Sequence, residues 1–565
     1  MALSKVTRAF YKTFAKRCLS TKSDFIKSSL PDVDIPRISL VEYVMKDFGK
    51  WGNKVAVECA ETGNKYTYND IQTKSFQLAK SLKNIKLQQN DVIALILPNI
   101  PEFPISILGS MLAGLRITTV NPSYTSTEIQ RQLLDADAKA IITFGSVVEN
   151  IQNAVKTTTK RTIPIITIKS SANEALPNNT ISFSDLLTGN TKGFSENLLG
   201  FDDIVVMPYS SGTTGLPKGV ELTNMNLVSN ITQFLSPAYG YLEEASETHQ
   251  DVLPAILPIY HIYGFTLQTL ALLMKGCKIV TLSKFTPELY LKSIVNHKAN
   301  ILMVAPPVVM FLNSHPSVKK EHLQHIRSIM CGAAPLGASD ENKIRDKVGH
   351  KLSIYQGLGL TETSPAIIMI PAHREGTVHG SIGHPFPNTT VKVVALEDNN
   401  LKHLGPNETG ELLVKGPQVM AGYHNNPKET SAAFIDGWFR TGDMVKYNED
   451  EMFFVADRIK ELIKVKGYQV APAELEETIR SFEGVAEAAV IGVPHPKFGE
   501  APRAYIMPKQ GVKIDLKKLN DYVKANLASY KQLEGGAVIV DMIPKNPSGK
   551  IMRRQLKLRF EENGF

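Results

Sequence analysis

The sequence predicts an α/β fold, with a large N-terminal domain of two parallel-type α/β sheet subdomains and a small β-barrel subdomain, followed by a small α+β C-terminal domain. Strand-like and helix-like patterns alternate over most of the chain, and the pattern changes near residues 360 and 457. The length of 565 residues agrees with three or four structural units. The expected boundaries are 24–456 for the large domain, 457–460 for a hinge and 461–565 for the small domain.

The alternation is clearest in the first half of the large domain. "VIALILP" is typical of a buried strand, "EFPISILGSMLAGL" of the helix behind it, and "AKAIITF" and "PIITI" of further strands. The pattern continues to about residue 360 through "DVLPAILP", "CKIVTL", "ANILMVAP" and "IRSIMCG". Alternation of this kind predicts parallel sheets covered by helices.

Short alternating segments separated by turn residues follow. "NTTVKVVA", "TGELLVKGP" and "MVKYNEDEMFFVAD" predict a small antiparallel, barrel-like unit. Beyond "ADRIKELIKVKG" lies a module of about 100 residues with its own strands and helices, such as "PAELEETIRSF". Pro472 stands where the first turn of that helix tolerates a proline.

Composition excludes several classes of protein. Of 63 basic residues, six lie among the first 22, and the rest nearly balance the 55 acidic ones, so a nucleic-acid surface has no support. The most apolar stretch, "VIALILPNIPEFPISILGSMLAGL", is interrupted by prolines and Glu102, so it cannot span a bilayer as one helix. Four widely spaced cysteines show no metal-ligand or redox pairing and fit buried thiols in a reducing compartment.

Residues 1–23 have the pattern of a targeting segment. Arg8, Lys12 and Lys16 lie roughly opposite an apolar stripe on a helical wheel, and the first acidic residue is Asp24. A basic, amphipathic, acid-free leader predicts a mitochondrial presequence. The alternative is a disordered basic tail on a cytoplasmic protein. A peroxisomal location is expected least, because "EENGF" lacks a Ser-Lys-Leu type signal.

The segment "YSSGTTGLPKGV", residues 209–220, buries too little to be explained by packing. Its glycines permit positive φ and close backbone approach to a ligand, and its Ser and Thr hydroxyls and Lys218 can contact an anion. Successive N–H groups in such a turn form a concave site suited to a polyphosphate. The segment is not a Walker P-loop, because Gly219 follows Lys218. A flexible surface loop is the alternative.

This segment closely resembles the phosphate loop of the adenylate-forming enzymes, which include acyl-CoA synthetases, 4-coumarate–CoA ligases, beetle luciferases and peptide-synthetase adenylation domains. The resemblance covers nearly the whole chain after the leader, and the 4-coumarate–CoA ligase and luciferase branch is the most similar. Further matching motifs, in order, are "LPNIPEF", "NPSYTSTEI", "LPIYHIYGF", "CGAAPLG", "QGLGLTETSP", "TGELLVKGPQVMAGYHNNP", "DGWFRTGD", "DRIKELIKVKGYQVAPAELE" and "PKNPSGKIMRR".

The resemblance implies a two-step reaction with ATP and coenzyme A as co-substrates and Mg²⁺ as the metal. A carboxylate attacks the α-phosphorus of ATP to give an acyl-adenylate and pyrophosphate, and a thiol then displaces AMP. Both steps concentrate negative charge, which positioned cations and N–H donors stabilise.

The resemblance also assigns roles in the large domain. The residues expected to hold the β- and γ-phosphates are Ser210, Ser211, Gly212, Thr213, Thr214 and Lys218. Thr361 is expected at the α-phosphate, and Glu362 at Mg²⁺. Asp443 and Arg458 are the expected ribose contacts. Taken alone, Glu362 also fits a surface acid and Asp443 an ordinary turn residue.

The acid and the adenine are expected to share a pocket lined by Gln356 and Gly357. His261 is expected to gate the substrate carboxylate near the α-phosphate, although a lone histidine in an apolar setting is also typical of a core. Tyr263 and Ala333 are expected in the acyl pocket, with Tyr260 and Ala334 nearby.

The small domain is expected to act as a mobile lid. Lys550 is the expected catalytic cation of adenylation. A rotation about Lys460 would withdraw it and present "KVKGYQ", in which Lys464 and Gln469 match adenylate contacts and Lys466 and Gly467 match coenzyme A contacts. Lys284 is a further candidate contact for the coenzyme A phosphates.

The expected function is therefore that of a carboxylic acid–CoA ligase acting on a fatty or aryl monocarboxylic acid. A luciferase-like monooxygenase that acts through a luciferyl-adenylate shares every adenylation residue and remains an alternative. A catalytically inactive acyl-adenylate-binding protein is a third reading, against which the retained lysines and carboxylates weigh. A peptide-synthetase module is disfavoured, because no carrier or condensation domain accompanies the adenylating unit.

One position departs from the family pattern. The family usually has tyrosine stacked on adenine before its Thr-Glu pair, and this chain has Leu358. An aliphatic side chain covers the base but loses aromatic geometry worth about 1 kcal/mol. We therefore expect Leu358→Tyr to lower the KM for ATP in steady-state assays. An unchanged or higher KM would count against the stacking explanation.

Overall fold

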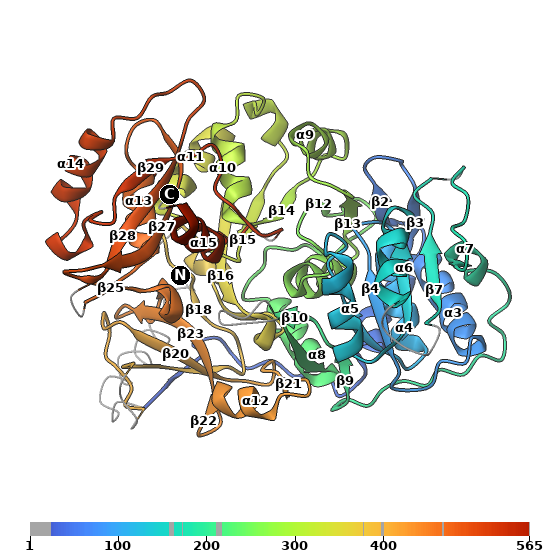
Figure 1. The fold of residues 1–565 in the computed structure, drawn as a ribbon. Helices are drawn as coiled ribbons and strands as arrows, with labels where there is room; N and C mark the ends of the chain where they lie inside the picture. Colours follow the sequence, from blue (N-terminus) through green and yellow to red (C-terminus); the bar gives the residue numbers. More distant parts are fainter. Residues whose placement is uncertain are drawn as a thin grey trace, which may run out of the picture.

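The computed structural model describes residues 24–156, 163–171, 173–210, 217–376, 378–396, 401–465, 468–547 and 549–563. The expected presequence, residues 1–23, lies outside this part of the chain. The C-terminal domain, coloured red, lies at the upper left in Figure 1, beside the large domain. None of the helices in the described ranges has the length and apolar character needed to cross a bilayer.

A nine-stranded sheet forms the first layer of the large domain, in the order β10-β11-β9-β5-β4-β6-β7-β8 with β21 paired to β11. Its strands are β4 (Val92–Ile96), β5 (Arg116–Thr119), β6 (Ala138–Phe144), β7 (Ile165–Ile168), β8 (Ile181–Ser182), β9 (Ile204–Val206), β10 (Tyr209–Ser210), β11 (Lys218–Thr223) and β21 (Gly422–Tyr423). The strands from β9 to β8 pair in parallel, whereas β11 is antiparallel to both of its neighbours β9 and β10.

Helices cover both faces of this sheet (Figure 1). Ile93 and Leu95 of β4 pack with α3 (Tyr68–Asn84) and α4 (Glu102–Leu112), whereas Ala94 and Ile96 pack with α5 (Ser126–Asp135) and α6 (Val148–Lys156). Because successive side chains of a strand point to opposite faces, an uninterrupted apolar run fits a strand covered on both sides. Capping boxes at the starts of α3 and α5 fix where these helices begin.

Two further sheets complete the α/β part. One has the order β12-β13-β2-β3 and the other β14-β15-β16-β17-β18. Their strands are β2 (Val55–Cys59), β3 (Lys65–Thr67), β12 (Val252–Ala255), β13 (Lys278–Thr281), β14 (Ile301–Val304), β15 (Ser328–Cys331), β16 (Ser353–Gly359), β17 (Ala366–Met369) and β18 (His384–Pro385). The helices of the large domain not yet named are α2 (Leu40–Met45), α7 (Phe183–Leu186), α8 (Asn224–Phe234), α9 (Pro287–Asn296), α10 (Pro306–Ser314), α11 (Ala338–Val348) and α12 (Pro427–Ala433).

An antiparallel sheet stands where the sequence predicts a small barrel. It runs β1-β19-β20-β23-β22, with β24 paired to β23, and among the described residues these pairings do not close into a ring. Its strands are β1 (Ile26–Lys27), β19 (Thr390–Val394), β20 (Gly410–Lys415), β22 (Phe434–Ile435), β23 (Trp438–Tyr447) and β24 (Phe453–Arg458).

The joint between the domains lies slightly later than the sequence predicts. Asp457 and Arg458 belong to β24 and pair with Met444 and Asp443 of β23, so they are part of the large domain. A short 3₁₀ turn, Ile459–Glu461, then leads into the C-terminal domain. Asp457 also accepts a hydrogen bond of 2.9 Å from the backbone N–H of Ala473 in the first turn of α13 (Pro472–Arg480), whose own N-cap offers no side-chain bond.

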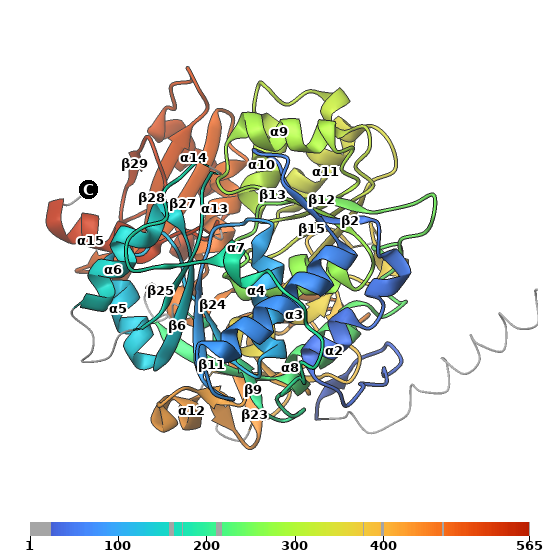
Figure 2. The same cartoon turned by 90° about the vertical axis from the view of Figure 1, so that its right-hand side faces the viewer.

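The C-terminal domain is a five-stranded sheet with helices on both faces. The order is β26-β25-β28-β27, with β29 paired to β28. Its elements are β25 (Ile463–Val465), β26 (Tyr468–Val470), β27 (Val485–His495), β28 (Gly499–Pro508), β29 (Ala537–Ile539), α13, α14 (Leu516–Asn526) and α15 (Arg553–Asn563). One face packs on α13 and α14 and the other on Leu556 of α15, and Figures 1 and 2 show α15 well apart from α14.

Close contact between α3 and α4 depends on Gly109. A Cβ added there would lie 2.7 Å from Leu78 Cδ2 and 2.9 Å from Leu78 Cβ. We expect Gly109→Ala to lower the free energy of unfolding by about 1–3 kcal/mol, because overpacking outweighs the gain in helix propensity. Urea unfolding would measure the change, with Gly49→Ala as the control, since nothing lies within 4 Å of a Cβ there. A variant as stable as the wild type would show that the two helices adjust without cost.

Candidate active site

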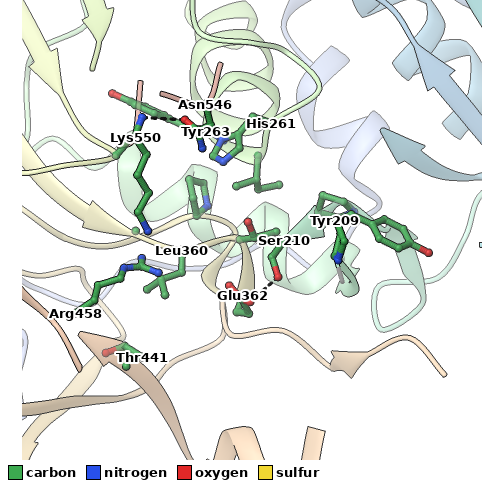
Figure 3. A pocket seen from close by; sticks show the side chains of 18 of the residues that line it. Tyr209, Ser210, His261, Tyr263, Leu360, Glu362, Thr441, Arg458, Asn546 and Lys550 are labelled. Atoms are coloured by element: carbon green, nitrogen blue, oxygen red, sulfur yellow. Dashed lines mark hydrogen bonds between the residues drawn. The ribbon is translucent and has the colours of Figure 1, made fainter. Parts of the chain in front are cut away.

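A cavity of about 1330 Å³ lies between the large domain and the C-terminal domain. The large domain contributes residues from β10, β11, β16 and β24, and the C-terminal domain contributes the segment that carries Lys550 and the start of α15. Figure 3 shows Lys550 and Arg458 pointing into the same space, with Ser210 and Glu362 nearby. The cavity therefore joins motifs that are more than 300 residues apart in the sequence.

Asp443 and Arg458 form the centre of the charged wall. They are paired across β23 and β24, and Arg458 Nε lies 3.0 Å from Asp443 Oδ1. Arg458 lines the cavity, whereas Asp443, 2% exposed, does not line it and contacts Arg458. Burial raises the pKa of Asp443, whereas Arg458 and Lys550 oppose that rise. Among the described residues Asp443 Oδ2 has no hydrogen-bond partner, so this buried oxygen can accept a hydroxyl from a ligand.

Lys550 is held by a tight turn of the chain. The backbone N–H of Lys550 donates to Asn546 Oδ1 at 2.8 Å, and the backbone N–H of Asn546 donates to the Lys550 carbonyl at 2.9 Å. The ammonium lies 3.6 Å from a carboxylate oxygen of Glu461. Burial and Arg458 lower the pKa of Lys550, and Glu461 and Asp443 partly offset that effect. The turn thus presents one cation to the cavity from the C-terminal domain.

Glu362 lies at the other side of the cavity. Its Oε1 accepts hydrogen bonds of 3.0 Å from the hydroxyls of Ser210 and Tyr423. Lys218 lines the cavity as well, where it pairs with Glu429 of α12 and lies 5.1 Å from the centre of the Tyr423 ring. Tyr423 therefore contacts both residues, Glu362 through its hydroxyl and Lys218 through its ring.

His261 precedes a π-helical segment, Tyr263–Ala271, a rare conformation found mainly at functional sites. Gly264 permits the close approach of this segment to the preceding loop, because a Cβ there would lie 2.1 Å from the Pro258 carbonyl oxygen. The backbone N–H of Tyr263 donates to His261 Nδ1 at 3.3 Å. A neutral ring with Nδ1 as acceptor carries its proton on Nε2. Burial lowers the pKa of His261 from 6.5 to about 4, so the ring is neutral near pH 7.

The wall beside His261 is mainly apolar. Tyr263 packs near Gly332, where a Cβ would lie 3.2 Å from the tyrosine ring, and Ala333 lines the cavity next to it. Further lining residues here are Tyr260, Leu267, Met330, Leu358, Ile368 and Met369. The buried Tyr263 hydroxyl has no hydrogen-bond partner in the described part of the chain. This region can hold an apolar acyl group, with one hydroxyl available to it.

The structure brings most of the predicted site residues together. Lining the cavity are Ser210, Lys218, His261, Tyr263, Ala333, Gly357, Thr361, Glu362, Arg458 and Lys550. Ser211, Gly212, Thr213, Thr214, Lys466 and Gly467 lie outside the described residues, as do the side chains of Lys460 and Gln469.

Gln356 differs from the expectation. Its side chain is 2% exposed and turned away from the cavity, where it donates to the Leu336 carbonyl at 3.0 Å and to Glu341, and accepts from the Leu336 N–H at 3.0 Å. Because its donors and acceptor bond to the protein, Gln356 braces the middle of β16, and the next residues, Gly357 and Leu358, line the cavity.

Three further residues of the expected site do not line the cavity: the adenylate contact Lys464, the coenzyme A contact Lys284 and Ala334 beside the acyl pocket. Both lysines are exposed. Conversely, the sequence analysis missed Tyr423, Glu429, Glu461 and Arg553, which all line it. Tyr423 and Glu429 lie within or just beyond the motif "TGELLVKGPQVMAGYHNNP", and Glu461 and Arg553 lie near predicted lysines, but no spacing rule connects these residues to their partners.

Two models of known protein families match this chain. The model of the AMP-binding enzyme family matches residues 46–424, and the model of the AMP-binding enzyme C-terminal domain matches residues 474–550. The chain belongs to the AMP-binding enzyme family. The resemblance to adenylate-forming enzymes inferred from the motifs is thereby confirmed, and so is the α/β fold with a smaller C-terminal domain.

This AMP-binding enzyme has curated relatives of full length. 4-Coumarate–CoA ligase 1 of Petroselinum crispum is 35% identical over 548 residues, which are 96% of this chain and 98% of the relative. A probable 4-coumarate–CoA ligase 1 of Dictyostelium discoideum is 34% identical over 547 residues, 94% of this chain and 97% of its own length. The AMP-binding enzyme thus shares the full length of these ligases.

Solved structures of similar fold cover nearly the whole chain. ATP-bound MatB from Rhodopseudomonas palustris is 29% identical and superposes with a TM-score of 0.81, covering 93% of this chain and 99% of MatB. The apo form of MatB, with the same coverage, superposes with a TM-score of 0.72. The AMP-binding enzyme therefore superposes better on the ATP-bound form than on the apo form.

The lowered pKa of His261 makes stability depend on pH. Above 6.5 the ring is neutral in both states, but between 6.5 and about 4 the unfolded chain gains a proton that the folded chain does not. We expect the free energy of unfolding to fall by about 2 kcal/mol between pH 7 and pH 4. This is less than the pKa shift alone would give, because the ring faces the cavity and is partly solvated there. His261→Gln should flatten the pH dependence of the unfolding midpoint, and the exposed His325, changed to Gln, provides the control. Equal slopes for all three proteins would contradict the assignment.

Proposed function

We propose that this AMP-binding enzyme is a carboxylic acid–CoA ligase that adenylates a fatty or aryl monocarboxylic acid with ATP and passes the acyl group to coenzyme A, with release of AMP and pyrophosphate. The observation that carries the proposal is the convergence of Lys550, Arg458 and the unpaired Asp443 oxygen beside an apolar pocket. This set matches a nucleotide at one end and an acyl chain at the other.

The chain's own groups account for adenylation. The oxygen of Asp443 that lacks a partner among the described residues accepts a ribose hydroxyl, and Arg458 orients that carboxylate and opposes the rise in its pKa that burial causes. Charge develops on the α-phosphate oxygens when the acid attacks, and the half-buried Lys550 ammonium stabilises that charge. The neutral His261 ring offers its Nε2–H at the cavity, where it can orient the substrate carboxylate by a hydrogen bond. Because the ring carries no charge, it does not compete with the Lys550 ammonium for the substrate oxygens.

Glu362 and Ser210 fit the Mg²⁺ ion that ATP-dependent chemistry requires. Mg²⁺ is usually held by one or two carboxylates together with substrate phosphates. In the described ranges no cluster of three or more His, Cys, Asp or Glu residues could form a cage of protein ligands. A single buried carboxylate beside a hydroxyl agrees with a metal that arrives with the nucleotide, and the metal would neutralise phosphate charge.

The lining residues support a monocarboxylic substrate. The wall formed by Tyr260, Tyr263, Leu267, Ile368 and Met369 is apolar apart from two tyrosine hydroxyls. The basic side chains of the cavity belong instead to the β strands of the nucleotide wall and to the C-terminal domain. A second carboxylate on the substrate would therefore lack a counter-charge in the apolar part.

The present arrangement suits the first half-reaction. Lys550 faces the cavity, whereas Lys464, the expected contact of the second half-reaction, is exposed elsewhere. A turn of the C-terminal domain about the segment after Arg458 would exchange the two lysines. The greater similarity to ATP-bound MatB than to its apo form supports this assignment.

The two half-reactions should separate in lysine variants. We expect Lys550→Ala to lower acid-dependent ATP–pyrophosphate exchange by about 10²–10³-fold, since one preorganised cation is removed, while supplied acyl-adenylate still reacts with coenzyme A. Lys464→Ala should leave ATP–pyrophosphate exchange nearly unchanged and slow the reaction of supplied acyl-adenylate with coenzyme A. Lys524→Ala, on α14 outside the cavity, is the matched control.

The wild-type assay would use acids of increasing chain length together with substituted benzoic and cinnamic acids. Pyrophosphate release and thioester formation with at least one of them is the expected result. Absence of exchange with every acid would overturn the proposed function.

A further inference from the structure

We propose that Glu461, the last residue of the turn between the domains, is a positioning residue for Lys550. It fixes the chain segment that carries the lysine through Arg553, and its carboxylate provides the counter-charge closest to the ammonium. The inference rests on the proposed function, because it assigns Glu461 a part in the adenylation step.

The carboxylate of Glu461 contacts two cations with its two oxygens. Oε1 lies 3.6 Å from Lys550 Nζ, and Oε2 accepts a hydrogen bond of 2.6 Å from Arg553 Nη1. The longer contact exceeds hydrogen-bond range, so it supplies attraction without occupying the donors of the ammonium. Lys550 therefore stays available to bond substrate oxygens, whereas Arg553 is firmly engaged.

Arg553 is anchored to the core of the C-terminal domain. Its Nη2 donates to Glu476 Oε1 at 2.7 Å, and its Nε donates to the Val490 carbonyl at 3.2 Å. The side chains of Arg553 and Glu476 are 13% and 6% exposed, and the backbone N–H of Val490 donates to Glu476 at 2.8 Å. A planar guanidinium held at three points cannot rotate freely. Its hydrogen bond to Glu461 Oε2 therefore keeps the Glu461 carboxylate in one position.

The segment between Lys550 and Arg553 leaves little freedom. On one side, the bonds between Asn546 and Lys550 close the turn, and a bridge joins Lys545 to Ile551. On the other side, Arg553 begins α15 and is clamped as described. The ammonium is thus fixed by the turn through its backbone and by Glu461 at its far end.

Charge balance shows why a carboxylate is needed at this position. The charged groups that face Lys550 are Arg458, Glu461, Asp443 and Arg553, of which the two arginines lower its pKa and the two carboxylates raise it. Once a ribose hydroxyl occupies Asp443, its carboxylate is partly screened, and Glu461 remains as the counter-charge nearby. Without Glu461, burial and the two arginines would lower the pKa of Lys550 further, and a larger share of the amine would be neutral at alkaline pH, where it cannot stabilise a developing anion.

The position of Glu461 in the chain links this role to the lid. It belongs to the same turn as Lys460, where the resemblance places the pivot. A change in backbone angles there redirects Glu461 relative to Arg553 and Lys550. Glu461, the counter-charge of Lys550, therefore lies in the turn whose backbone would change between the two half-reactions.

The test compares Glu461→Gln with Arg553→Lys. Glu461→Gln keeps the shape and removes the charge, so we expect acid-dependent ATP–pyrophosphate exchange at pH 8 to fall by at least about 10-fold in kcat, with little change in the KM for ATP. The alkaline limb of its pH–rate profile should move to lower pH by about one unit. Arg553→Lys keeps the charge and loses the clamp, so its rate should fall while its alkaline limb stays in place.

A second readout does not depend on turnover. Competitive acetylation of the lysines at a series of pH values, read by mass spectrometry, gives the pKa of the Lys550 amine in each protein. We expect a lower value in Glu461→Gln than in the wild type. Glu474→Gln is the matched control, because Glu474 pairs with Lys531 at 2.6 Å in the same domain and away from the cavity.

The outcomes separate this inference from the proposed function. A wild-type protein without exchange activity would overturn the function, whereas the acetylation result would still report on the Glu461–Lys550 contact. A folded Glu461→Gln variant with wild-type rate, alkaline limb and Lys550 pKa would overturn the inference alone. If Glu461→Gln fails to fold, an Arg553→Lys variant that retains the full exchange rate would overturn it equally.

Discussion

Asp443 lies on β23, where it is 2% exposed and where Arg458 of the neighbouring strand is its nearest counter-charge. A buried carboxylate is costly unless it is paired and hydrogen-bonded, and here one oxygen lacks a partner in the described part of the chain. A sugar hydroxyl removes that deficit. Because the domain joint begins directly after Arg458, the pair proposed to hold the ribose also stands where the C-terminal domain begins.

The remaining charges of the cavity are arranged around that pair. Lys218 pairs with Glu429, and Lys550 with Glu461, so each cation already has a carboxylate before any phosphate arrives. When a polyphosphate binds, Lys218 would exchange one anionic partner for another, whereas Glu461 would stay beside Lys550 as its counter-charge. An exchange of partners costs less than burying a new charge, and it keeps an empty site from accumulating positive charge. The paired carboxylates are thus part of the binding machinery although they would repel the ligand.

The sequence predicted the local structure of this enzyme well and its ion pairs poorly. Strands β4, β6 and β7 and helix α4 lie where apolar runs predicted them. Their hydrophobic patterns can be recognised from residues that are neighbours in the sequence. The motifs likewise located the cavity. Gln356 was expected in the cavity wall, but Glu341 and Leu336, distant in sequence, capture its side chain. Arg553 and Glu461 are 92 residues apart, and no local pattern indicates that they meet.

The hydrogen bond between Asp457 and the first turn of α13 joins the two domains. Asp457 belongs to the large domain, yet it caps a helix of the lid that has no side-chain cap of its own. Such a cap is worth about 1 kcal/mol, and a turn of the lid would break it. If the domain turns as proposed, this bond would therefore stabilise the arrangement in which Lys550 faces the cavity, before coenzyme A is engaged. One capping bond would thereby favour an ordered addition of substrates over a random one.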